Sequence, residues 1–141
     1  MIPALAYGTT FYLDDKEGRS QFYKSFFTNL GVTYGLKLSV DKKRPNGGDQ
    51  SFPSGHTSAA FQGAAFIQRR YGWKYGIPAY IGAAFVGYSR VESDNHYPED
   101  VVAGAAIGVI SSFYFTTPYK GITISPFADK GYYGLELDAR L

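Results

Sequence analysis

Apolar and polar positions follow a helical period through most of this chain of 141 residues. From Gln21 to Lys37 the apolar residues recur every three or four positions, which predicts a helix. These residues are Phe22, Phe26, Phe27, Leu30, Tyr34 and Leu36. The segment from Ala4 to Leu13 is typical of the tail of an interrupted helix. Residues 4–13 and 21–37 are therefore expected to be helical, and the charged, glycine-rich segment from Asp41 to Ser51 is expected to be a loop.

Three proline residues indicate where further helices begin. Proline is favoured in the first turn because its missing N–H would have no partner there. Runs rich in alanine and glycine follow each proline, and they predict helices from Pro53-Ser54 to Arg70, from Pro78 to Tyr88 and from Pro98 to Phe115. Many of their residues are small, so we expect these helices to approach one another closely.

The pattern changes to a period of two after Pro118. Ile122 and Ile124 alternate with polar residues, and Tyr133, Leu135 and Leu137 do the same after an Asp-Lys-Gly turn signal at residues 129–131. This alternation predicts a short β-hairpin. The sequence thus predicts a single all-α domain over residues 1–141, a helical bundle with a strand-like extension at residues 119–141.

Charge and cysteine content exclude several classes of function. The formal net charge is only +2 and there is no long basic run, so we do not expect a nucleic-acid partner. The chain has no cysteine, which excludes disulfides, thiolate zinc sites and a cysteine nucleophile. It has two histidines, so any histidine chemistry must involve His56 or His96.

The stretch from Val101 to Tyr119 is uncharged and approaches the ~20 residues that a membrane-spanning helix needs. However, Gly104, Gly108 and Ser112 equally suit close packing inside a bundle, and the mean hydropathy of the chain is −0.20. We expect a soluble or peripherally membrane-associated domain. Met1 to Gly8 lacks the basic and apolar regions of a signal peptide, although a chain that starts inside a longer precursor would look the same.

Three short segments contain most of the candidate catalytic groups. They hold Lys37 with Arg44-Pro45, then Pro53-Ser54-Gly55-His56, then Ser89-Arg90 with His96 and Asp100. His96 and Asp100 are four residues apart at a helix start, so the carboxylate is expected to accept the Nδ1 proton of the imidazole. Nε2 would then be free to act as a nucleophile or base.

The remaining groups of these segments suit an anionic substrate. Arg90 offers a planar fork for phosphate oxygens, and Lys37 and Arg44 add two cations. Ser54 and Gly55 lie at a helix N-terminus, where free N–H groups bind anions, and His56 is placed to protonate a departing oxygen. One aspartate and two histidines are too few clustered ligands for a metal cage. The combination favours metal-independent phosphoryl transfer.

Together the three segments match the full signature of the family that joins type 2 phosphatidic acid phosphatases, class A acid phosphatases and vanadium haloperoxidases. The resemblance covers about Lys37 to Phe115 and implies an all-α core and a metal-independent phosphatase. It implies that His96 attacks phosphorus to form phosphohistidine, that Asp100 orients His96, and that His56 protonates the leaving group and later activates water. The implied phosphate-binding groups are Lys37, Arg44, Ser54, Gly55 and Arg90.

The same resemblance favours a phosphomonoester or pyrophosphate of a membrane lipid as substrate. A soluble non-specific acid phosphatase is the first alternative, and a vanadium-dependent haloperoxidase with His96 as axial ligand is the second. A non-catalytic anion-binding module is a third, but no signature position is missing. We expect no cofactor, with vanadate binding as a phosphate mimic, and a periplasmic or otherwise extracytoplasmic location, either soluble or peripherally associated with a membrane. The sequence does not specify an oligomeric state.

Overall fold

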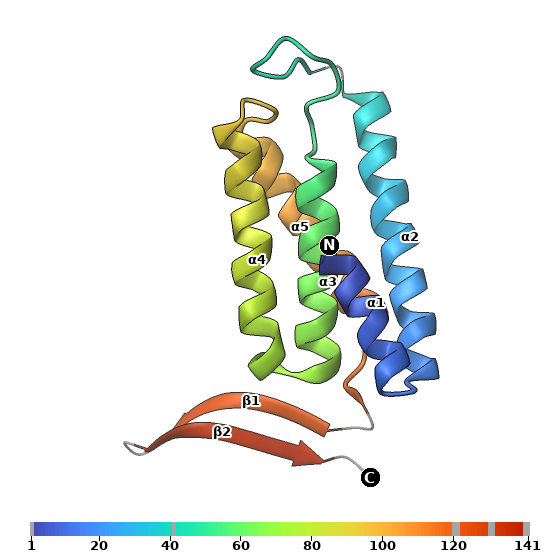
Figure 1. Ribbon diagram of the computed structural model, residues 1–141, viewed down its shortest axis with the longest axis vertical. Helices are drawn as coiled ribbons and strands as arrows, with labels where there is room; N and C mark the ends of the chain where they lie inside the picture. Colours follow the sequence, from blue (N-terminus) through green and yellow to red (C-terminus); the bar gives the residue numbers. More distant parts are fainter. Residues whose placement is uncertain (1, 41, 120–121, 130–131, 140–141) are drawn as a thin grey trace.

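The computed structural model describes residues 2–40, 42–119, 122–129 and 132–139, which form a helical bundle with a two-stranded sheet at one end (Figure 1). The helices are α1 (Ile2–Tyr12), α2 (Lys16–Ser39), α3 (Gly55–Tyr71), α4 (Trp73–Glu92) and α5 (Pro98–Phe115). The strands are β1 (Ile122–Asp129) and β2 (Tyr132–Ala139), which pair antiparallel with Ile122 opposite Ala139. The predicted all-α bundle is confirmed.

Helix α3 is the centre of the bundle and packs against the other four helices. Helices α2 and α4 flank it along its length, and the short α1 lies against its lower half (Figure 1). The predicted hairpin turn includes residues 130–131, which lie outside the described residues. The division of the chain into one domain with a C-terminal extension stays a prediction.

The start of α4 differs from the predicted one. The helix begins at Trp73, so Pro78 lies inside it and only Gly72 separates α3 from α4. Gly72 has a φ of 99°, a backbone conformation that favours glycine and lets the chain reverse within one residue. Pro78 is the sixth residue of α4, so the helix lacks one main-chain hydrogen bond to the carbonyl of Lys74 just after its first turn.

The core combines two small apolar clusters with a polar seam. One cluster contains Ala6, Phe22 and Phe66, and the other contains Ala60, Ala64 and Ala83. Between α2 and α3, Gln62 Nε2 donates to Ser25 Oγ at 2.9 Å, and Thr33 Oγ1 donates to Ser58 Oγ at 3.1 Å. The buried face of α2 is thus largely polar, and Phe27 and Tyr34, which helped to predict this helix, are exposed.

A buried ion pair ties the chain together at the end that carries the sheet. Arg70 donates to both carboxylate oxygens of Asp15, at 2.6 and 2.7 Å, and Tyr71 donates to the same group at 2.8 Å. Arg70 also donates to the carbonyl of Thr117. This network joins the start of α2 to the end of α3 and to the segment after α5.

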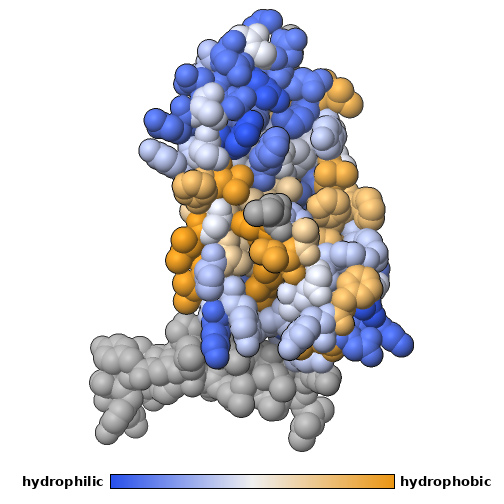
Figure 2. All heavy atoms as spheres, viewed as in Figure 1, coloured by the Kyte–Doolittle hydropathy of each residue, from blue (hydrophilic) through white to orange (hydrophobic). Residues whose placement is uncertain are grey.

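Hydrophilic residues gather at the opposite end of the bundle, and hydrophobic residues cross its middle (Figure 2). In the described part of the chain, no helix combines the length and the apolar character needed to cross a membrane.

Candidate active site

The three signature segments meet at the hydrophilic end of the bundle, where α2 and α4 end and α3 and α5 begin. Two main-chain hydrogen bonds hold the connecting loops together. Asn46 donates to the carbonyl of Asp94 at 3.1 Å, and Ser54 donates to the carbonyl of Asp100 at 3.0 Å. Residues far apart in sequence are therefore fixed side by side.

His96 is buried, with 2% of its surface exposed, and its ring is held by the loop that precedes α3. Its Nδ1 donates to the main-chain carbonyl of Ser51 at 2.7 Å. A carbonyl only accepts hydrogen bonds, so Nδ1 carries the proton and Nε2 keeps its lone pair. Burial lowers the pKa of His96 to about 4, and the charges of Arg44 and Lys37 act in the same direction. The ring is therefore neutral at pH 7.

The predicted direct bond between His96 and Asp100 is not formed, because His96 Nδ1 and Asp100 Oδ2 are 3.9 Å apart. Asp100 instead accepts hydrogen bonds from Lys42 Nζ at 2.6 Å, from the Tyr97 amide at 2.8 Å and from the hydroxyl of Ser51. Burial alone would raise the pKa of Asp100, but these donors outweigh it and lower the pKa. Asp100 is thus a charged anchor for Ser51, the residue whose carbonyl holds His96.

The three signature cations converge on His56. Burial is the largest cause that lowers the pKa of this histidine, and the charges of Arg90, Arg44 and Lys37 lower it further. Unlike His96, His56 is only partly covered by its neighbours and reaches the surface of the site. It can therefore exchange protons with solvent and with a bound molecule.

Each cation is held differently. Lys37 is buried, and its Nζ donates to the carbonyl of Gln50 at 3.0 Å. Arg44 Nε donates to the carbonyl of Asp49 at 3.0 Å. Arg90 Nε is buried and has no hydrogen-bond partner among the described residues. A buried donor without a partner is rare, and a guanidinium N–H in this position suits an anionic ligand.

The structure gives the Ser54 hydroxyl a local role. Ser54 is the N-cap of α3, where its Oγ accepts from the Thr57 amide at 3.3 Å and donates to Thr57 Oγ1 at 2.9 Å. The side chain is fully buried. The N–H groups of Gly55 and His56 belong to the first turn, which has no acceptors within the helix. Gly55 also lies against the Lys37 side chain.

Sequence reasoning missed Ser51 and Lys42. Neither belongs to the signature, and Lys42 resembles its neighbour Lys43 in sequence. Only the fold separates them, because Lys42 reaches the buried Asp100 whereas Lys43 pairs with the exposed Asp49. The one available signal was the position of Ser51, two residues before the Pro-Ser-Gly-His segment.

The fold and site define a helical bundle with a neutral buried histidine beside a cluster of three cations. Residues 10–122 match the family model described as the PAP2 superfamily, and the chain belongs to this family. It is 37% identical over 84 residues to the lipid A 1-phosphatase of Porphyromonas gingivalis, covering 57% of this chain and 19% of that protein. It is 28% identical over 131 residues to the lipid A 4′-phosphatase of Helicobacter pylori, covering 84% of this chain and 66% of that protein.

The chain thus spans less than two thirds of the length of these relatives. Among solved structures, the crystal structure of Aquifex aeolicus LpxE has a TM-score of 0.69 at 23% identity, covering 80% of this chain and 79% of that one. This likeness supports the same fold.

Proposed function

We propose that the chain hydrolyses a phosphomonoester or pyrophosphate of a membrane lipid, without a metal, through a phosphohistidine intermediate on His96. The observation that carries the proposal is the state of His96. Its Nδ1 proton is committed to the carbonyl of Ser51, so that Nε2 is an unprotonated nucleophile near the cations of Lys37 and Arg44.

In the first step, Nε2 of His96 attacks phosphorus and the bond from phosphorus to the leaving oxygen breaks. Lys37, Arg44 and Arg90 stabilise the charge on the remaining phosphate oxygens. His56 gives its proton to the leaving oxygen. The pKa of His56 is lowered in the free protein, but the negative charge of a bound phosphate would raise it and favour the protonated acid.

In the second step, His56 removes a proton from water, and the resulting oxygen attacks the phosphohistidine. The bond between phosphorus and Nε2 breaks, and phosphate leaves the site. The proposed steps use only side-chain groups of this site. Within the described part of the chain, no three His, Cys, Asp or Glu side chains are placed to hold a metal ion.

The lipid class is supported by the two relatives, both of which are named for removing phosphate from lipid A. A lipid substrate would place the hydrophilic end of the bundle at a membrane surface, in keeping with the proposed extracytoplasmic, peripheral location.

The test compares phosphate release by the wild type and by His96→Ala from lipid phosphates and from soluble monoesters. We expect His96→Ala to lose at least about 1,000-fold in kcat and to lose the acid-labile phosphoenzyme that the wild type forms. Vanadate should compete with substrate, and EDTA should have no effect. Retained activity in His96→Ala would contradict the nucleophile, and inhibition by EDTA would contradict metal independence.

His56→Ala provides a second test of the mechanism. Because His56 protonates the leaving oxygen, this variant should form the phosphoenzyme much more slowly from an alkyl phosphate than from p-nitrophenyl phosphate, whose leaving group needs little protonation. Equal losses in the rate of phosphoenzyme formation from the two substrates would contradict the assignment of His56 as the acid.

A further inference from the structure

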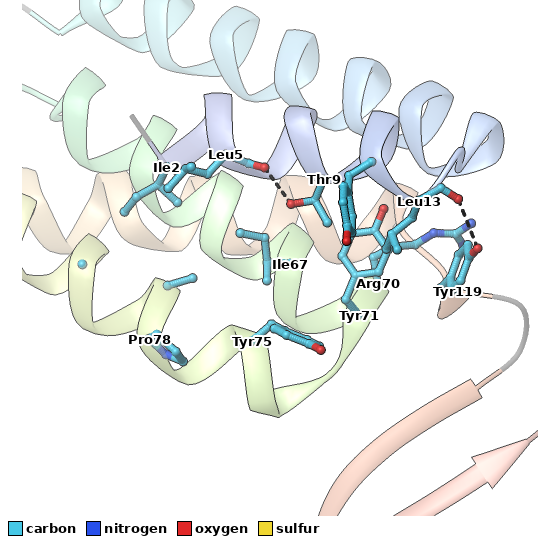
Figure 3. A pocket seen from close by; sticks show the side chains of 13 residues that line it. Ile2, Leu5, Thr9, Leu13, Ile67, Arg70, Tyr71, Tyr75, Pro78 and Tyr119 are labelled. Carbon is cyan, nitrogen blue, oxygen red and sulfur yellow. Dashed lines mark hydrogen bonds between the residues drawn. The ribbon is translucent and has the colours of Figure 1, made fainter.

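A cavity of about 650 Å³ lies between α1, α3 and α4, away from the hydrophilic end of the bundle (Figure 3). Leu5 and Thr9 of α1, Ile67 of α3, and Pro78 and Ala79 of α4 form much of its wall. Pockets of this size hold small organic ligands. Nothing in the proposed phosphoryl transfer uses this cavity.

The chemistry of the wall suits an apolar ligand. The Arg70 guanidinium faces this region but is bound to Asp15, and the Tyr71 hydroxyl donates to the same carboxylate. Thr9 Oγ1 donates to the carbonyl of Leu5 at 2.8 Å (Figure 3). These polar groups are engaged with neighbours, so the surface offered to a ligand is mainly hydrocarbon.

The cavity shares two helices with the phosphate site. At its upper end, Ile2 packs against Gly63 of α3 and Gly82 of α4. His56 lies seven residues before Gly63, and Arg90 lies eight residues after Gly82. At ~1.5 Å per helical residue, the cavity begins about 10–12 Å from the phosphate-binding groups, along the same helices.

Helix α1 begins at Ile2 beside the middle of the bundle, so the described part of α1 packs below the stretch of α3 and α4 that lies between the two sites (Figure 1). Ala59 of α3 and Val86 of α4 lie on this path and are half-buried. On the same face the surface changes from hydrophilic at the end of the bundle to hydrophobic at its middle (Figure 2). An elongated molecule with a charged head and an apolar tail matches this order.

We propose that the cavity between α1, α3 and α4 binds the alkyl chain of the lipid phosphate whose headgroup occupies the site of His56, His96 and Arg90. The inference rests on the proposed function and adds the means by which the chain length of the substrate is selected. Each methylene that leaves water on binding strengthens the affinity about fourfold. Only chains long enough to pass Ile2 gain from the cavity.

The test measures binding of phosphonates, which are not hydrolysed, and so does not depend on catalysis. A long-chain alkylphosphonate, kept below its critical micelle concentration, is compared with methylphosphonate by calorimetry. We expect the long-chain compound to bind the wild type at least about tenfold more tightly, because it buries many methylenes. Equal affinities would overturn the proposal. The same result is expected if another segment or a second copy of the chain fills the cavity.

Two surface variants provide the matched comparison. Leu5 lines the cavity and is 66% exposed, whereas Ile110 lies on α5, outside this cavity, and is 68% exposed. Leu5→Asp should remove most of the advantage of the long chain and leave methylphosphonate binding unchanged. Ile110→Asp should keep that advantage. An equal loss in both variants would show general association with the surface and overturn the proposal.

A third variant fills the cavity without adding charge. Thr9→Phe should shift the preferred substrate to shorter chains while its rate on a soluble phosphomonoester stays at the wild-type level. An unchanged chain-length profile would contradict the proposed cavity. The two proposals can fail separately. If no substrate releases phosphate, the proposed function is contradicted. If phosphate is released at the same rate whatever the length of the alkyl chain, only the proposed binding site for the alkyl chain is contradicted.

Discussion

At the residue scale, the proposed chemistry depends on how His96 is held. Its Nδ1 bonds to a main-chain carbonyl, and the residue that supplies this carbonyl, Ser51, is fixed through its hydroxyl to Asp100. Lys42 completes the arrangement by pairing with Asp100. Asp100 therefore contacts His96 indirectly through Ser51, and in the proposed mechanism Ser51 and Lys42 would be positioning residues.

Lys42→Met tests this arrangement. Removing the ammonium leaves the buried carboxylate of Asp100 without its ion pair. Because Lys42 is partly exposed, we expect the free energy of unfolding to fall by about 2 kcal/mol. The pKa of Asp100 should rise, and kcat should fall about tenfold with little change in KM. Urea unfolding and steady-state kinetics measure these effects, and Lys42→Arg should recover part of both.

Lys43→Met is the matched control, since Lys43 pairs with Asp49 and both side chains are exposed. We expect the free energy of unfolding to change by less than about 0.5 kcal/mol and kcat to stay the same. Similar effects in the two variants would contradict a specific role for Lys42.

At the scale of the elements, the close contact between α3 and α5 sets the position of the site. Both helices begin at the site, and their axes approach where α5 carries Gly104 and Gly108. A Cβ added to Gly108 would lie 2.3 Å from the Ser58 carbonyl oxygen and 2.6 Å from the Gln62 amide nitrogen. Both atoms are main chain, so the helices would have to separate.

Gly108→Ala should therefore destabilise the fold, by about 2 kcal/mol or more, because the added methyl overpacks the interface. Gly31→Ala on α2 is the control, since nothing lies within 4 Å of its added Cβ. In an exposed helix position this change should stabilise the protein by about 0.5–1 kcal/mol. Thermal unfolding of both variants measures the difference, and a stable Gly108→Ala protein would contradict the close packing described here.

At the scale of the whole molecule, the bundle separates two environments. The end with the candidate site is hydrophilic, the middle is apolar at its surface, and the buried Asp15–Arg70 pair lies at the other end. A neutral buried histidine at the charged end ties the stability of the fold to pH. Lys37, Arg44 and Asp100 are the charged groups that act on it.

The sign of this dependence follows from the pKa of His96, which is about 4 in the folded protein against 6.5 for the free side chain. The unfolded chain therefore binds a proton more readily, and stability falls as the pH drops from about 6.5 to about 4. Across this range, the protonation of His96 lowers the free energy of unfolding by about 3 kcal/mol in total. Urea unfolding of the wild type and of His96→Gln across this range should show a steeper loss in the wild type. Parallel curves would contradict the lowered pKa.

Much of the fold was predictable from the sequence because helix signals are local. The apolar period and the prolines located α2, α3 and α5 to within a few residues, and α5 from Pro98 to Phe115 without error. Pro78 misplaced the start of α4, because a single glycine at position 72 was enough to reverse the chain. The buried face of α2 was also not predictable, since its polar residues pair with partners on α3.

For the site, the sequence by itself determined which residue types are available and their order, including both histidines and the three cations. Only the tertiary structure decided their partners. It gave the Nδ1 proton of His96 to Ser51 rather than Asp100, gave the Ser54 hydroxyl to the helix cap, and distinguished Lys42 from Lys43. The physical reason is that hydrogen bonds are selected by distance and direction in space. The partners of Asp100 lie up to 58 positions away along the chain, and no local pattern encodes them.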